Sequence, residues 1–137
     1  GVEPFLIAAT LESIIAQRLI RKICLQCRLE YQPSDGELME LNLRRESVKD
    51  RLFYYGKGCD NCNHTGYKGR TAIFEIMAIT DSIKELIIAK ASTGTIRDKA
   101  RLEGMKTLRD SAMFRLYEGT TTIEEVLKAT QFQDTIQ

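Results

Sequence analysis

The chain lacks an apolar run long enough to cross a membrane, and nothing in it resembles a signal peptide. It also lacks an excess of either charge, because 20 basic and 19 acidic side chains leave a net charge of +1. A near-neutral protein has no global positive field to attract nucleic acid or anionic lipid. The phosphate-binding loop Gly-x-x-x-x-Gly-Lys-Ser/Thr is absent too, since Gly66-x-x-Gly69-Arg70 has the wrong spacing and no lysine. We therefore expect no ATP hydrolysis from this chain alone.

The amino-acid composition is that of a soluble globular protein. Of the 137 residues, 43% are apolar and 28% are charged, which are ordinary values for a folded domain. A chain of this length forms one domain or two small ones, and it buries about two thirds of its unfolded surface.

Cysteine is scarce, and its four copies form two Cys-x-x-Cys pairs: Cys24 with Cys27, and Cys59 with Cys62. The stretch between the pairs is long enough for the chain to return, so both pairs can reach one ion. Four cysteine sulfurs at about 2.3 Å in a tetrahedron are typical of structural zinc. Such a site has no open position for water, which excludes a catalytic role for the metal. Reduced thiols in this pattern indicate the cytoplasm.

Two other interpretations of the cysteines stay open, namely two disulfides and a redox-active Cys-x-x-Cys. The lack of a signal peptide disfavours disulfides, and a redox motif does not need a matching second pair. The single histidine, His64, is a conceivable replacement ligand. It follows Cys62 in a polar turn, however, and we interpret it as an exposed turn residue.

Hydrophobic spacing before and between the cysteine pairs predicts helices and one strand. Apolar residues at steps of three and four predict a helix from about Phe5 to Lys22 that ends at the zinc site. A capping box that starts at Ser34 predicts a short helix, and the charged stretch from Arg44 to Arg51 predicts another helical turn. The aromatic residues 52–55 are typical of a strand.

After the second cysteine pair, the sequence predicts one strand followed only by helices. Residues 71–77 are nearly all apolar, so we expect a strand buried on both faces except at Glu75. Helices are expected to start near Asp81, at Thr93 or Thr95, at Thr107 and at Thr122, and residues 131–137 to form a frayed tail. The predicted fold class is α+β and predominantly helical.

Several segments together are characteristic of one protein family. They are Gly1-Val2-Glu3-Pro4-Phe5-Leu6-Ile7-Ala8, Ala16-Gln17-Arg18-Leu19-Ile20-Arg21-Lys22-Ile23-Cys24, Gly58-Cys59-x-x-Cys62-x-x-Thr65-Gly66-Tyr67-x-Gly69-Arg70-x-x-Ile73-x-Glu75 and Gly119-Thr120-Thr121-Thr122-Ile123-Glu124-Glu125-Val126. Shorter matches are Ile96-Arg97, Glu103-Gly104-Met105 and Thr107-Leu108. In this order, they resemble the C-terminal part of the bacterial type II secretion and type IV pilus assembly ATPases (the general secretory pathway protein E family). The resemblance covers essentially the whole chain.

The resemblance implies a fragment of a hexameric motor with a RecA-like core. In that family, the phosphate-binding loop and the acidic and histidine boxes precede the part matched here. ATP and Mg²⁺ are therefore expected as ligands of the full-length protein only. The implied domains are residues 1–23 as a helix of the ATPase core, 24–66 as the tetracysteine zinc-binding insertion, and 67–137 as a strand plus a C-terminal helical subdomain.

The resemblance also implies partners. These are the rest of the ATPase core, neighbouring subunits of the hexamer, and proteins of the inner-membrane platform, with a cytoplasmic location at that membrane. The charged stretch from Arg44 to Arg51 is either the platform contact or a solvated insertion. Severed from its core, the fragment is expected to self-associate through Phe5, Leu11, Ile15, Phe74 and Ile76.

No catalytic residue is expected in this chain. At each of three sites, however, the polar residues have two possible roles. Arg70 either reaches a phosphate or neighbouring subunit, or neutralises the thiolate cluster. Gln17 and Arg18 are either a family signature or a solvated helix face. Glu75 is either a structural partner for an arginine or a base, and the first is favoured.

A different class of function is a free four-cysteine zinc ribbon that binds nucleic acid. Three tyrosines lie near basic residues in the sequence, as stacking on a single strand requires: Tyr54, Tyr55 and Tyr67 beside Lys57, Lys68 and Arg70. The near-zero charge and the helical C-terminal half argue against it. A chaperone zinc domain of the DnaJ type requires repeated Cys-x-x-Cys-x-Gly-x-Gly, which is absent.

Overall fold

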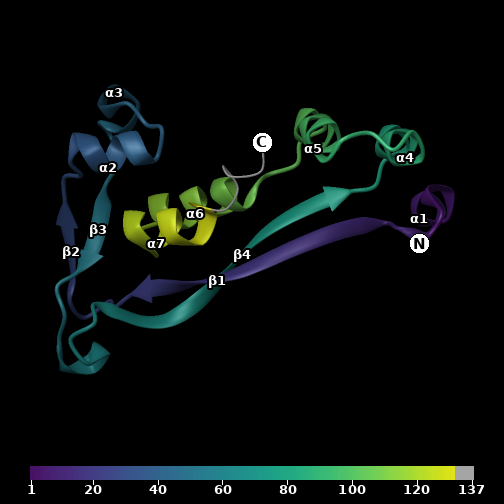
Figure 1. Ribbon diagram of the computed structural model, residues 1–137. Helices are drawn as coiled ribbons and strands as arrows, with labels where there is room; N and C mark the ends of the chain where they lie inside the picture. The colour runs from purple at the N-terminus through teal and green to yellow at the C-terminus, as the bar shows by residue number, and fades with distance from the viewer. Residues whose placement is uncertain (132–137) are drawn as a thin grey trace.

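Two long antiparallel strands, β1 (Ser13–Ile23) and β4 (Tyr67–Ala78), form a ribbon along the molecule in the computed structural model, which describes residues 1–131 (Figure 1). Ser13 lies opposite Ala78, and the register is regular as far as Arg21 opposite Arg70. It shifts between Arg21 and Ile23, immediately before the first cysteine. The ribbon therefore leads directly into the cysteine-rich end of the molecule.

The predicted helix from Phe5 to Lys22 is wrong over most of its length. Only α1 (Pro4–Thr10) is helical there, and β1 begins at Ser13. Isoleucines at positions 14, 15, 20 and 23 suit a pleated strand, and their spacing fits helical and strand periods almost equally well. The distant strand β4 supplies a ladder of hydrogen bonds, and this tertiary pairing decides between the two.

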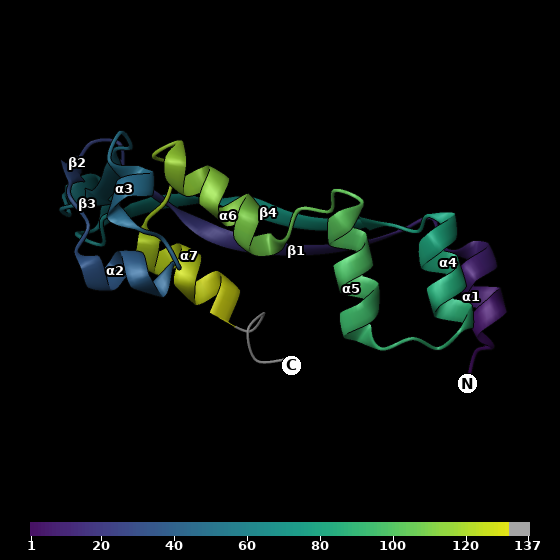
Figure 2. The same ribbon diagram turned by 90° about the horizontal axis from the view of Figure 1, so that it is seen from above.

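The strand predicted over residues 71–77 is present and longer, but it is not buried on both faces. Phe74 is 42% exposed and Ile76 is 52% exposed. Within residues 1–131, the helices cover one side of the ribbon and leave the other side bare, as Figures 1 and 2 show. An apolar strand sequence is thus a guide to burial only when both covering layers are present.

In the segment between the cysteine pairs, the two predicted helices and the predicted strand are confirmed, whereas a further strand, β2 (Arg28–Tyr31), was not predicted. The elements of this segment are β2, α2 (Asp35–Glu40), α3 (Arg45–Val48) and β3 (Phe53–Gly56), followed by the 3₁₀ helix η1 (Asp60–Cys62). Strands β2 and β3 pair antiparallel, with Arg28 opposite Gly56. The predicted capping box begins α2, because Ser34 Oγ accepts from Glu37 N at 3.2 Å and Glu37 Oε2 accepts from Ser34 N at 2.8 Å.

Helices follow β4, as expected: α4 (Asp81–Ile88), α5 (Thr93–Leu102), α6 (Leu108–Tyr117) and α7 (Ile123–Thr130). Thr107 and Thr122 are N-caps, as predicted. The cap of α5 is Ser92 rather than Thr93 or Thr95, since its Oγ accepts from Thr95 N at 3.2 Å. The expected frayed tail lies outside the described residues, apart from Gln131. No helix of the described part is long and apolar enough to span a membrane.

The buried apolar residues form two separate cores along the ribbon. The first core joins residues 24–66 (the cysteine insertion) to α6, α7 and the ribbon. Its members are Ile20, Leu38, Leu41, Val48, Phe53, Ile73, Leu108, Ala112, Leu116, Ile123 and Val126. The second core is built around Ile79, Ile83 and Ala100. It lies at the other end, where α4 packs beside α1 (Figure 2). The fold is α+β, and the insertion shares its core with the last two helices.

Candidate metal centre

The four cysteines meet at the end of the ribbon. Cys24 directly follows β1, and Cys27 directly precedes β2. Cys59 directly precedes η1, and Cys62 is the last residue of η1. Their four sulfur atoms all lie within 4.8 Å of one another. The Sγ–Sγ distance is 3.8 Å for Cys24–Cys59, for Cys27–Cys62 and for Cys59–Cys62. A tetrahedron with sulfur about 2.3 Å from its centre has edges of about 3.8 Å, so this spacing suits one metal ion.

Hydrogen-bond donors of the surrounding turns point at the sulfurs. Cys27 Sγ accepts from Gly58 N at 3.3 Å, and Cys62 Sγ accepts from the backbone N–H groups of Cys59 and Gly66, also at 3.3 Å. Gly58 and Gly66 have φ values of 98° and 78°, which few residues other than glycine adopt without strain. These glycines therefore allow the turns in which N–H groups stabilise thiolates.

Without a metal ion, the surrounding protein lowers the pKa of two of the cysteine thiols and raises that of a third. Burial opposes ionisation of Cys62, but the N–H donors of Cys59 and Gly66 outweigh it and lower its pKa to about 6. Burial likewise opposes ionisation of Cys24, yet hydrogen bonds led by the Asn61 side chain lower its pKa. Burial raises the pKa of Cys27 to about 11. A dication bound at the centre would supply the positive charge that favours the thiolate form in such a cluster.

The geometry disfavours two disulfides and also a ligand role for His64. All four are free thiols, and sulfur spacings of 3.8 Å far exceed the bond length of about 2.0 Å in a disulfide. His64 does not join the sulfur cluster. Its side chain is 73% exposed and its Nε2 lies 3.0 Å from Asp60 Oδ1, so its interpretation as an exposed turn residue is confirmed.

Two glycines allow the second cysteine turn to pack against the end of β3. A Cβ atom added to Gly56 would lie 2.0 Å from Gly66 O, and one added to Gly66 would lie 2.4 Å from Gly56 O. The same carbonyl of Gly66 accepts from Cys24 N at 2.9 Å. This contact was not predicted from the sequence; the only local signal for it is glycine at both positions.

Arg70 lies on β4, directly opposite Arg21, and is exposed. Its position at the cysteine end of the ribbon is compatible with both roles that the sequence suggests, a contact with a phosphate or neighbouring subunit and neutralisation of the thiolates. Both remain predictions.

Two of the other candidate polar residues, Glu75 and Arg18, have structural partners. Glu75 Oε2 accepts from Leu108 N at 3.1 Å, so this carboxylate binds the first turn of α6. Arg18 Nη1 donates to Ala129 O at 2.9 Å, which places a cation at the C-terminal end of α7. Gln17 lies on β1 opposite Phe74 and is exposed. None of these contacts requires a catalytic role.

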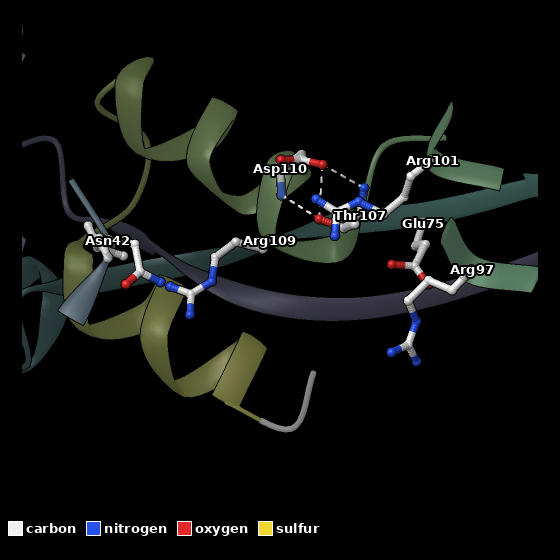
Figure 3. A pocket seen from close by; sticks show the side chains of 8 residues that line it. Asn42, Glu75, Arg97, Arg101, Thr107, Arg109 and Asp110 are labelled. Carbon is white, nitrogen blue, oxygen red and sulfur yellow. Dashed lines mark hydrogen bonds between the residues drawn. The ribbon is translucent and has the colours of Figure 1, made fainter. Parts of the chain in front are cut away.

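A charged hollow lies between α5, α6 and β4 (Figure 3). It has a volume of about 220 Å³ and is lined by Arg97, Arg101, Arg109, Glu75 and Asp110, among others. The carboxylate of Asp110 accepts from Thr107 N and Oγ1, both at 2.9 Å. Figure 3 shows that the side chains of Arg97 and Arg109 extend in different directions, so the arginines do not enclose a single anion.

The sequence is similar to that of characterised secretion proteins. A profile of the family described as "Type II/IV secretion system protein" matches residues 1–128. The "Type IV pilus assembly ATPase PilB" of Thermus thermophilus is 42% identical over 130 residues, which is 95% of this chain and 15% of that protein. The protein of the same description from Myxococcus xanthus is 38% identical over 128 residues, with 93% and 23% covered.

A secretion ATPase is similar over the same length. The "Type II secretion system ATPase E" of Vibrio cholerae is 34% identical over 131 residues, which is 96% of this chain and 25% of that protein. The chain thus spans between 15% and 25% of the length of these three relatives. Since the family profile covers nearly all of the sequence, the chain belongs to the type II/IV secretion system protein family.

Proposed function

We propose that this chain is the C-terminal part of a motor ATPase that powers type II secretion or type IV pilus assembly. The family match and the names of the relatives support the motor assignment. The part proposed here is mechanical rather than catalytic, because its sequence contains no phosphate-binding loop. The observation on which the proposal rests most is the closed cluster of four cysteine sulfurs at one end of the ribbon.

The metal that fits this cluster best is zinc in a structural role. Four sulfur ligands and a tetrahedral spacing are typical of Zn²⁺, and no open position is left for water or substrate. The ion would cross-link the end of β1 to η1, and so would hold the insertion against the ribbon. Cys24, Cys27, Cys59 and Cys62 are the proposed ligands.

Two of the charged residues in the stretch from Arg44 to Arg51 already bind side chains of this chain. Arg45 Nε donates to Asp35 Oδ1 at 2.7 Å, and the Arg51 guanidinium carbon lies 4.0 Å from the centroid of the Tyr117 ring. The charged residues of this stretch that have no such contact within the described residues are Arg44, Glu46, Lys49 and Asp50, all exposed. We propose that these four couple the motor to the platform at the cytoplasmic side of the inner membrane.

The tyrosines that would support nucleic-acid binding are already packed against side chains of the protein. The guanidinium carbon of Arg21 lies 3.9 Å from the centroid of the Tyr67 ring, and that of Arg28 lies 4.6 Å from the Tyr54 ring. Tyr55 contacts Tyr31 edge to face. Because each of these rings already contacts a side chain of the protein and the net charge is only +1, we propose no nucleic-acid partner.

The purified 137-residue chain should neither hydrolyse ATP nor bind it tightly. Phosphate release measured with Mg²⁺ should equal that of a buffer blank. The matched comparison is a longer polypeptide of the same protein that includes the phosphate-binding loop, which should turn over ATP. Turnover that co-elutes with the short chain through two different columns would contradict its placement as a non-catalytic part.

The bare side of the ribbon should make the isolated chain self-associate. Ile15 is 61% exposed there, beside Leu19, Phe74 and Ile76, and we propose that the ATPase core covers this face in the full-length protein. Light scattering should show dimers or larger species that revert to monomer in the variant Ile15→Glu/Ile76→Glu. The control Leu102→Glu, at an exposed leucine on α5, should leave the association unchanged. A monodisperse wild-type monomer at high concentration would refute this expectation.

A further inference from the structure

The turn between α6 and α7 contacts the last residues of β1, immediately before Cys24. Ile23 N donates to Thr120 O at 2.9 Å, and Thr121 Oγ1 donates to Arg21 O at 2.8 Å. Thr121 is completely buried. The turn therefore continues the hydrogen bonding of the ribbon at the point where its register shifts.

A buried carboxylate on α7 holds the same strand end. Glu125 is 5% exposed. Its Oε2 accepts from the backbone N of Arg21 at 2.7 Å, and its Oε1 accepts from Arg21 Nε at 2.9 Å and Nη2 at 2.7 Å. Three charge-assisted bonds from one residue satisfy this carboxylate. Glu125 thus fixes both the backbone and the side chain of Arg21, three positions before a metal ligand.

Further contacts link the cysteine insertion to the same turn. Arg28 Nη1, from the strand after Cys27, donates to Gly119 O at 3.2 Å. Phe53 of β3 packs edge to face on Tyr117 of α6, with 6.4 Å between the ring centroids. The first apolar core includes residues of both parts, whereas α4 and α5 belong to the second core. The insertion therefore packs directly against α6 and α7 through both polar and apolar contacts.

We propose that Glu125 is a positioning residue for the metal centre, so that metal binding and the docking of α6 and α7 stabilise each other. When α7 is docked, Glu125 binds Arg21 and so fixes the end of β1. The position of that strand end determines where Cys24 lies in the cluster. Such coupling is reciprocal, because each event changes the free energy of the other by the same amount. The proposal rests on the zinc site proposed above. In a motor, any movement of α6 and α7 would carry the metal-binding insertion with it as a rigid body.

Amide hydrogen exchange of the 137-residue chain tests the coupling without any substitution. Zinc content is measured first; a chain that binds no metal contradicts the proposed zinc site itself. With zinc bound, adding a chelator should remove protection from residues 24–66 and, together with them, from α6 and α7. Helices α4 and α5 should keep their protection. Loss confined to residues 24–66 would overturn the coupling and leave the zinc site intact.

A pair of neighbouring variants tests the role of Glu125. Glu125→Gln keeps the shape but removes the charge that Arg21 binds, and should speed chelator-induced zinc release on the order of tenfold. Glu124→Gln changes the exposed neighbour, which accepts a long hydrogen bond of 3.5 Å from Tyr67 Oη that a glutamine oxygen can also accept, and it should release zinc at the wild-type rate. Cobalt substitution adds a second measurement, since the thiolate absorption bands of Glu125→Gln should shift if Cys24 is displaced. If folded Glu125→Gln releases zinc at the wild-type rate and has the wild-type cobalt spectrum, the proposal is overturned. If that variant does not fold, the exchange experiment on the wild type decides.

Discussion

Replacing Cys62 with serine should abolish stoichiometric zinc binding and unfold the cysteine insertion. Its sulfur lies 3.8 Å from those of both Cys27 and Cys59 and accepts two backbone hydrogen bonds. A serine hydroxyl does not replace a thiolate on zinc, and structural zinc contributes on the order of 10 kcal/mol to folding such sites. Elemental analysis should give one zinc per wild-type chain and none in Cys62→Ser, with loss of the near-ultraviolet circular dichroism signal.

The histidine beside the cluster provides the matched control for this experiment. His64→Ala changes an exposed residue of the same turn and should retain one zinc. The unfolding in Cys62→Ser should extend to α6 and α7, because the insertion shares its core with them, and should leave the second core folded. Retention of zinc by Cys62→Ser together with its loss from His64→Ala would mean that the ligand set is wrong.

Adding a single methyl group at Gly56 should destabilise the chain by at least about 4 kcal/mol, at the upper end of single substitutions. The new Cβ would lie 2.0 Å from Gly66 O, and no flexible side chain is there to move aside. Either β3 or the second cysteine turn has to shift, and the hydrogen bond between Cys24 N and Gly66 O then lengthens. Urea denaturation of zinc-loaded protein measures the loss.

Another glycine separates this steric effect from the general effect of replacing glycine. Gly94 lies in the first turn of α5, where the nearest atom to an added Cβ is Ser92 Oγ at 3.8 Å. Gly94→Ala should therefore be neutral or stabilising by up to about 1 kcal/mol. Equal stability of Gly56→Ala and Gly94→Ala would show that the close approach of the two backbones does not constrain the fold.

Features encoded by neighbouring residues were predictable from the sequence. The cysteine pairs, the capping boxes at Ser34 and Thr107, and the order of the last four helices all rest on spacings within a few positions. The ribbon was not predictable in the same way, because β1 has no local partner and its apolar spacing also suits a helix. The contact between Arg21 and Glu125 joins residues 104 positions apart, so no local pattern indicates it.

The position of the cysteine cluster also determines how the two long strands align. Both faces of the ribbon carry apolar residues, with Ile20 and Ile73 on the covered side and Ile15 and Ile76 on the bare side. A slip by one residue exchanges one apolar set for another, so hydrophobic pattern alone specifies strand alignment weakly. Because β1 ends directly before the cluster and β4 begins shortly after it, a metal ion bound to the four cysteines would fix the two strands relative to each other and so favour one alignment. By fixing the alignment, the ion would also influence which residues of the two strands lie opposite each other at the far end, beside α1 and α4.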